Sequence, residues 1–206
     1  LNDYNKNNVT FKQSTKLLDD KLTVSSNVML IQEITKNKNT AGYYLNPLTG
    51  LYLFPRDKDY SYYAKNYQVF SAERNMYLQN WHVSDHFQSN PEWIIHNQRR
   101  EDLTRRMISN LSVELNLSDH LNLQLRGNYD YAIKTNEKKN KAGSNATNVH
   151  PNGSWDYQKY SDELIYGDAL LAYSNNLGGL SIDAVLGTSY QKSTYGLGFS
   201  VSTGTD

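Results

Sequence analysis

Two histidines lie close together in the sequence, and their spacing suits a metal ion. His82 and His86 are four residues apart, with Asp85 between them. On a helix, side chains at i and i+4 share a face, so the two imidazoles would bind one ion together. The segment 81–87 has no firm helical pattern, however, and offers no obvious third ligand. We therefore predict no metal site here.

The common catalytic motifs are missing from the chain. It has no Gly-x-Ser-x-Gly turn, no phosphate-binding glycine loop and no His-Glu-x-x-His motif. Its carboxylates are scattered, without an acid–base pair. Asp57 and Asp59 lack the remaining ligands of a calcium loop. The sequence predicts neither an enzyme nor a bound cofactor.

Aromatic residues gather in one stretch. Residues 43–93 hold 13 of the 25 aromatic side chains. Such rings suit a contact surface for sugar faces or for a partner's loops, because they offer flat area at little entropic cost. The other interpretation is that a long loop needs its own small core. For substrate or partner contact the candidates are Tyr62, Tyr63, Trp81 and Trp93, whereas Tyr52 and Phe54 are expected to pack inside.

The stretch from Met107 to Lys134 predicts the elements that carry this loop. Apolar and polar residues alternate on both sides of a short polar break at 118–120. A period of two is typical of β-strands, and two strands with a tight turn make an antiparallel hairpin. The strands are about twice the usual length of 5–6 residues. Tyr129 and Tyr131 would lie roughly 19–23 Å above Leu121 if the strands tilt by about 45°.

An apolar band with aromatic residues at its edge is typical of a transmembrane β-barrel. We expect one side of the hairpin to face lipid, through Leu111, Val113, Leu115, Leu121, Leu123 and Leu125. In a closed barrel, Arg126, Asn128 and Asp130 would face the lumen. A long hairpin of a soluble β-sandwich shows the same alternation, so that fold remains an alternative.

Composition limits the choices further. The formal net charge is zero, which gives no sign of nucleic-acid binding, and there is no cysteine for disulfides or thiolate metal sites. No run of about 18 apolar residues occurs, so transmembrane helices are not expected. Four arginines surround two acidic residues between 99 and 106. Mixed charges on a strand that projects above a membrane explain them better than an anion-binding groove.

The whole chain reads as all-β, an antiparallel meander of about six long strands in three hairpins. Turns at 18–21, 118–120 and 174–179 are short, whereas the connections at 36–92 and 135–161 are long. Short turns on one side and long loops on the other are typical of outer-membrane barrels. Six strands do not close such a barrel alone. The strands are expected at about 9–17, 22–35, 93–117, 121–134, 163–174 and 180–200.

Several segments resemble a known family. They are 46–56 (Asn-Pro-Leu-Thr-Gly-Leu-Tyr-Leu-Phe-Pro-Arg), 65–70, 75–81, 90–97 (Asn-Pro-Glu-Trp-Ile-Ile-His-Asn) and 105–131. Together they resemble the barrel region of the SusC/RagA family of TonB-dependent outer-membrane transporters of Bacteroidetes. The resemblance covers about residues 10–200, and the long loop and the central hairpin are its most specific parts.

The resemblance implies a 22-stranded barrel, a plug domain with a TonB box, and a SusD-like surface lipoprotein as partner. It implies import of oligosaccharides or peptides across the outer membrane, driven through TonB. No plug and no TonB box is found within the chain, so we expect it to be part of the barrel wall, with two extracellular loops, of a longer protein. The alternative is a soluble or surface β-sheet module that binds glycan through the aromatic loop 43–93.

Overall fold

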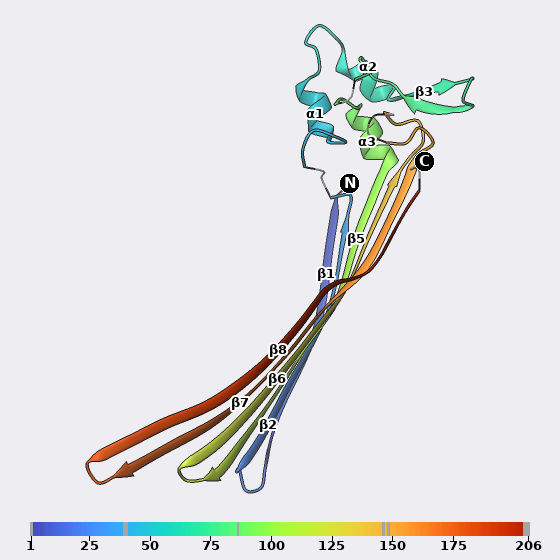
Figure 1. Ribbon diagram of the computed structural model, residues 1–206. Helices are drawn as coiled ribbons and strands as arrows, with labels where there is room; N and C mark the ends of the chain where they lie inside the picture. Colours follow the sequence, from blue (N-terminus) through green and yellow to red (C-terminus); the bar gives the residue numbers. More distant parts are fainter. Residues whose placement is uncertain (1, 39–40, 86, 146, 148, 204–206) are drawn as a thin grey trace.

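The chain folds into one long twisted sheet with a small loop subdomain at one end (Figure 1). The structure is a computed structural model that describes residues 2–38, 41–85, 87–145, 147 and 149–203. The loop subdomain consists of the described residues of 41–97 and 141–153. The three short turns gather at the opposite end of the sheet.

The expected antiparallel meander of six long strands is confirmed. The order in the sheet follows the chain, and every neighbouring pair is antiparallel. Of the described strands, β1 and β8 are the two edges, each paired on one side only. The strands are β1 Asp3–Leu17, β2 Leu22–Lys36, β5 Gln98–Ser118, β6 Leu121–Asn140, β7 Ser154–Leu177 and β8 Leu180–Thr203.

The registers of the six strands place like residues side by side. Directly opposite residues in an antiparallel pair point to the same side of the sheet, and successive residues point to opposite sides. One row of paired positions crosses all six strands and contains leucine at every strand, namely Leu17, Leu22, Leu115, Leu123, Leu171 and Leu186. We call the side that carries this row the apolar face and the other side the polar face.

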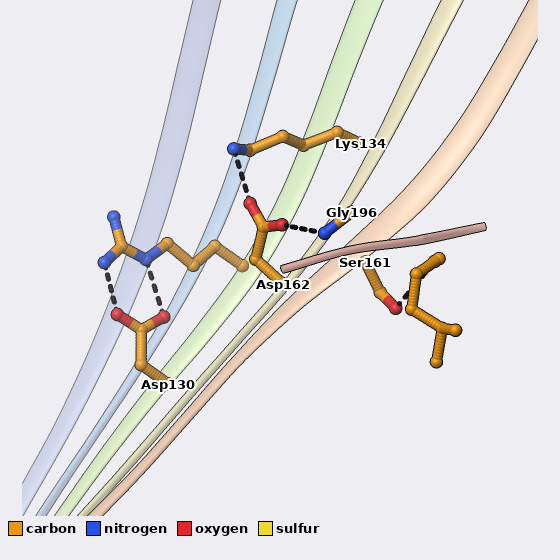
Figure 2. Close-up of polar contacts among 7 residues, drawn as sticks. Asp130, Lys134, Ser161, Asp162 and Gly196 are labelled. Carbon is orange, nitrogen blue, oxygen red and sulfur yellow. Dashed lines mark hydrogen bonds and ion pairs between the residues drawn. The ribbon is translucent and has the colours of Figure 1, made fainter. Parts of the chain in front are cut away.

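A β-bulge in β8 keeps its upper half in phase with the apolar face. The pairing with β7 shifts between Ser161 and Glu163, and Gly196 there has a φ of +68°. Asp162 stabilises the bulge. Its carboxylate accepts a hydrogen bond from the Gly196 N–H at 2.9 Å and forms an ion pair with Lys134 at 2.7 Å (Figure 2). Past the bulge, odd positions such as Phe199 take over from even positions such as Tyr190 on the apolar face.

Short helices and a hairpin make up most of the long connection expected at 36–92. Helices α1 (Pro47–Tyr52), α2 (Tyr60–Lys65) and α3 (Pro91–Asn97) alternate with a small hairpin of β3 (Gln68–Ser71) and β4 (Met76–Gln79). Each helix begins after an Asn or Asp whose side chain accepts a backbone N–H, which are Asn46, Asp59 and Asn90.

Several boundaries differ from those expected, and β1 begins at Asp3 instead of at about residue 9. Residues 93–97 belong to helix α3 and not to the start of a strand, because Asn90 and Pro91 begin a helix there. The second long connection is shorter than 135–161, since β6 continues to Asn140 and β7 begins at Ser154.

Candidate functional site

The two long connections fold together into the loop subdomain. The Gln79 N–H of β4 donates to the Gly143 carbonyl at 2.8 Å, and the Arg74 guanidinium donates to the Pro151 carbonyl at 3.0 Å. Gly143 in turn donates its N–H to the same Pro151 oxygen at 3.2 Å. The hairpin β3–β4 is therefore attached to residues 141–153 by hydrogen bonds of both backbone and side chain.

Trp93, a candidate for substrate or partner contact, is instead the centre of this subdomain. It is 0% exposed, as is Asn90. The Trp93 indole N–H donates to the Ser144 hydroxyl at 2.8 Å, and the Lys141 ammonium lies 5.5 Å from the ring centroid. The prediction of a contact role for Trp93 is wrong, because helix α3 turns this side chain inward against the second loop.

Trp81 and Tyr63 also pack inward. Both rings are half-buried and contact the Phe54 ring, with centroids 5.2 Å and 5.9 Å away. Tyr60 and His82 complete this aromatic cluster, at 5.5 Å and 5.2 Å from Phe54. The interpretation that the loop builds its own small core therefore holds for these five residues, and Phe54 packs as expected.

A different set of rings faces outward. Tyr62 is 55% exposed, as a contact residue would be, and Tyr52, which was expected to pack, is 84% exposed. Helix α1 buries Thr49 and Gly50. Gly50 packs against the start of α3, since a Cβ built on Gly50 would lie 2.5 Å from the carbonyl oxygen of Ser89, just before that helix. The opposite side of α1 is left to the solvent. With the neighbouring segments it forms an exposed apolar surface of Tyr43, Tyr44, Leu48, Leu51, Tyr52 and Phe87.

Of the two histidines considered as metal ligands, the structure describes only His82. His82 Nε2 lies 3.1 Å from Gln88 Oε1, and the Gln88 amide donates to Asp85 at 2.7 Å. Burial lowers the pKa of His82, which opposes its protonation. His86 lies outside the described residues. Within the described part of the chain no three His, Asp or Glu side chains gather as metal ligands would.

The polar face brings together the three residues expected to face a lumen. Arg126 forms an ion pair with Asp168 at 2.9 Å, and Asn128 donates to Asn110 at 2.7 Å. Asp130 accepts from the Arg106 guanidinium (Figure 2). A groove of about 730 Å³ follows two neighbouring rows of this face, one with Asn110 and Asn128 and one with Ser112 and Arg126. Arg126 and Asp168 in this groove neutralise each other, and Lys12 of β1 also lines it.

The six residues expected to face lipid share the apolar face. Leu111, Val113 and Leu115 of β5 are in register with Gly127, Leu125 and Leu123 of β6, and Ser118 is in register with Leu121. No described segment packs on this face. In the six strands only Ala132 and Asn140 are buried, and Leu111 and Leu125 are 50% and 42% exposed. Their contact with lipid stays a prediction.

Known proteins add no further assignment. No protein-family model matches the chain, and no curated protein matches it. None of the described helices is both long and apolar enough to cross a membrane. The resemblance to SusC/RagA transporters therefore rests on the quoted segments alone.

Proposed function

We propose that this chain is a barrel-wall segment of a TonB-dependent outer-membrane importer of oligosaccharides or peptides. In this proposal the apolar face meets lipid and the polar face lines the lumen. The observation that supports it most is the row of six leucines that crosses a sheet with nothing described above it. A soluble sandwich requires a second sheet over that row, and the described residues provide none.

The arrangement of the connections supports the same function. The short turns lie at one end of the sheet, and both long connections lie at the other (Figure 1). Outer-membrane barrels have short periplasmic turns and long extracellular loops. The loop subdomain would then be extracellular. Its exposed rings, with Tyr52 and Tyr62 among them, would contact a SusD-like lipoprotein or the substrate. Edges β1 and β8 would pair with further strands of the barrel.

Cysteine labelling on two adjacent positions tests the proposal. Leu123 lies on the apolar face, in register with Leu171, and Gln124 lies on the polar face, where it donates to Glu114 at 3.0 Å. Leu123→Cys and Gln124→Cys would each be made in the longer protein that we expect to contain this chain, in outer membranes. Each variant would react with a water-soluble maleimide and with a lipid-soluble one.

We expect Leu123→Cys to react only with the lipid-soluble reagent and Gln124→Cys to react with the water-soluble one. The two positions differ only in the side of the sheet, so each is the control for the other. If Leu123→Cys is shielded from both reagents while the protein is released into the soluble fraction, the barrel proposal is wrong. A covered β domain would then replace it.

A further inference from the structure

Two consecutive arginines on β5 have opposite environments. Arg106 points to the polar face, where its guanidinium pairs with Asp130. Arg105 points to the apolar face, because it is in register with Gln32 and Ile133. It is exposed, and no carboxylate of the described residues forms an ion pair with it. The charge of Arg105 is therefore free to meet something outside the described chain.

A groove of about 400 Å³ lies next to Arg105 on the same face. Two neighbouring rows build it. Asn7, Gln32 and Arg105 form its polar rim, in register with one another. Its apolar residues that belong to the apolar face are Val9, Leu30, Met107, Tyr131 and Ile133. The combination is a cation and two amides beside an open hydrocarbon surface, in which Val9 is 69% exposed and Leu30 is 52% exposed.

The position of the groove matches the edge of the apolar band. Tyr131 is in register with Met107, one row below Arg105 on this face. Aromatic residues mark the level where hydrocarbon gives way to headgroups. A cation one row further out lies at the level of the headgroups. The row of Tyr131 also contains an acidic residue, Glu163 of β7. Glu163 is two strands away from Arg105, which belongs to β5, and it accepts a hydrogen bond from the Tyr129 hydroxyl at 3.2 Å.

We propose that this groove binds a lipid with a net anionic, phosphate-bearing headgroup in the leaflet next to the loop subdomain. Arg105 contacts the phosphate, and an acyl chain lies along Val9, Leu30 and Met107. The fork of a guanidinium matches a phosphate with two parallel hydrogen bonds, and its positive charge complements that of the anionic headgroup. The Gln32 side-chain amide adds a donor on the same rim. This inference rests on the proposed membrane location of the apolar face.

The test is an equilibrium titration of the whole longer protein in a non-ionic detergent. The probes are fluorescent phosphatidylglycerol, which is anionic, and fluorescent phosphatidylcholine, which is zwitterionic. We expect the unchanged protein to bind phosphatidylglycerol more tightly. Arg105→Gln should weaken that binding roughly five-fold, the contribution of one arginine at an anionic surface. Arg105→Lys should fall between the two, because it keeps the charge and loses the fork.

Lys12→Gln is the matched control, because it removes one exposed positive charge from the polar face. It should leave phosphatidylglycerol binding unchanged. Equal weakening by Lys12→Gln and Arg105→Gln would overturn the proposal, since only net charge would then matter. Equal binding of the two lipids by the unchanged protein would do the same. Complete displacement by inorganic phosphate would show a site for free phosphate and not for lipid.

The outcome can be separated from that of the barrel proposal. Labelling of Leu123→Cys reports the environment of the apolar face and does not involve Arg105. If Leu123 meets lipid while phosphatidylglycerol is not preferred, the lipid site alone is wrong. If Leu123 is shielded from lipid, the barrel-wall proposal is wrong, and the lipid site that rests on it is wrong with it.

Discussion

The junction of the two loops depends on a glycine that leaves no room for a side chain. Gly143 has a φ of +89°, and a Cβ built on it would collide with the Tyr77 carbonyl oxygen and lie 3.1 Å from the Leu78 Cα. Gly42 has nearly the same backbone angle, with a φ of +92°, but nothing lies within 4 Å of its Cβ position. Gly143→Ala and Gly42→Ala therefore both place an alanine at a positive φ, but only the new Cβ at position 143 collides with neighbouring atoms.

The expected costs follow from this difference. An L-residue in the left-handed region costs about 1–2 kcal/mol, which both variants bear. At Gly143 the collision involves backbone atoms, so the hydrogen bonds from Gln79 to Gly143 and from Gly143 to Pro151 must break or lengthen. Each contributes about 1 kcal/mol net. We expect Gly143→Ala to cost about 2 kcal/mol more than Gly42→Ala, which opens the junction roughly 30 times more often.

Amide hydrogen exchange of the longer protein in detergent, read by mass spectrometry, measures this opening. Exchange should rise in 141–153 and at Gln79 in Gly143→Ala, and much less in Gly42→Ala. The amides of β5 and β6 serve as the internal reference and should not change. Equal effects of the two variants would refute the reasoning, because the collision would then carry no cost. A rise spread evenly over the sheet would refute it too.

Three further results are expected in the same protein. Trp93→Ala should destabilise the loop subdomain by about 3–5 kcal/mol, read as protease susceptibility, whereas the exposed Tyr62→Ala should stay within about 0.5 kcal/mol. Because burial lowers the pKa of His82 in the folded state, the His82 imidazole binds a proton more readily when the loop subdomain is unfolded. The contribution of His82 is thus present above about pH 6.5 and lost as the pH falls through the folded pKa, and His82→Gln should flatten this dependence of protease susceptibility on pH. Gly196→Ala should cost about 1–2 kcal/mol in thermal unfolding, because its φ is +68° and open space surrounds the new Cβ.

The sheet was predictable because its signal is local. Residues 107–134 alternate over many positions around a polar break, and that pattern alone sets which residues share a face.

The bulge in β8 is also visible in the sequence. Apolar positions change from even numbers up to Tyr190 to odd numbers from Leu197. One inserted residue is what such a change of parity indicates. The role of Asp162 in holding the bulge has no local pattern, because its partners Lys134 and Gly196 come from two other strands.

The helices of the loop subdomain had recognisable signals that the aromatic residues obscured. Asn46 and Asn90 are each followed by Pro, which is a common way to begin a helix. The burial of Trp93 was beyond a sequence argument. Its hydrogen-bond partner Ser144 lies 51 residues further along the chain, and no spacing or periodicity links the two. The exposed side of α1 became visible only once the contact of Gly50 with Ser89 was known.

Contact of the apolar face with water is energetically unfavourable, and this links the fold to the proposed function. Its residues that are more than half exposed include the six Val9, Phe11, Leu30, Leu180, Leu186 and Tyr190. Burying a large apolar side chain fully contributes about 1.5–3 kcal/mol, so covering the exposed half of these six gains roughly 5–9 kcal/mol. That is comparable to the whole stability of many domains, about 5–15 kcal/mol. Lipid covers such a face without any matching protein surface, whereas a soluble protein must supply a second sheet of the same extent. A free Arg105 at the upper edge of the band adds to this argument, because a covering sheet would have to provide it with a carboxylate and a membrane provides a phosphate.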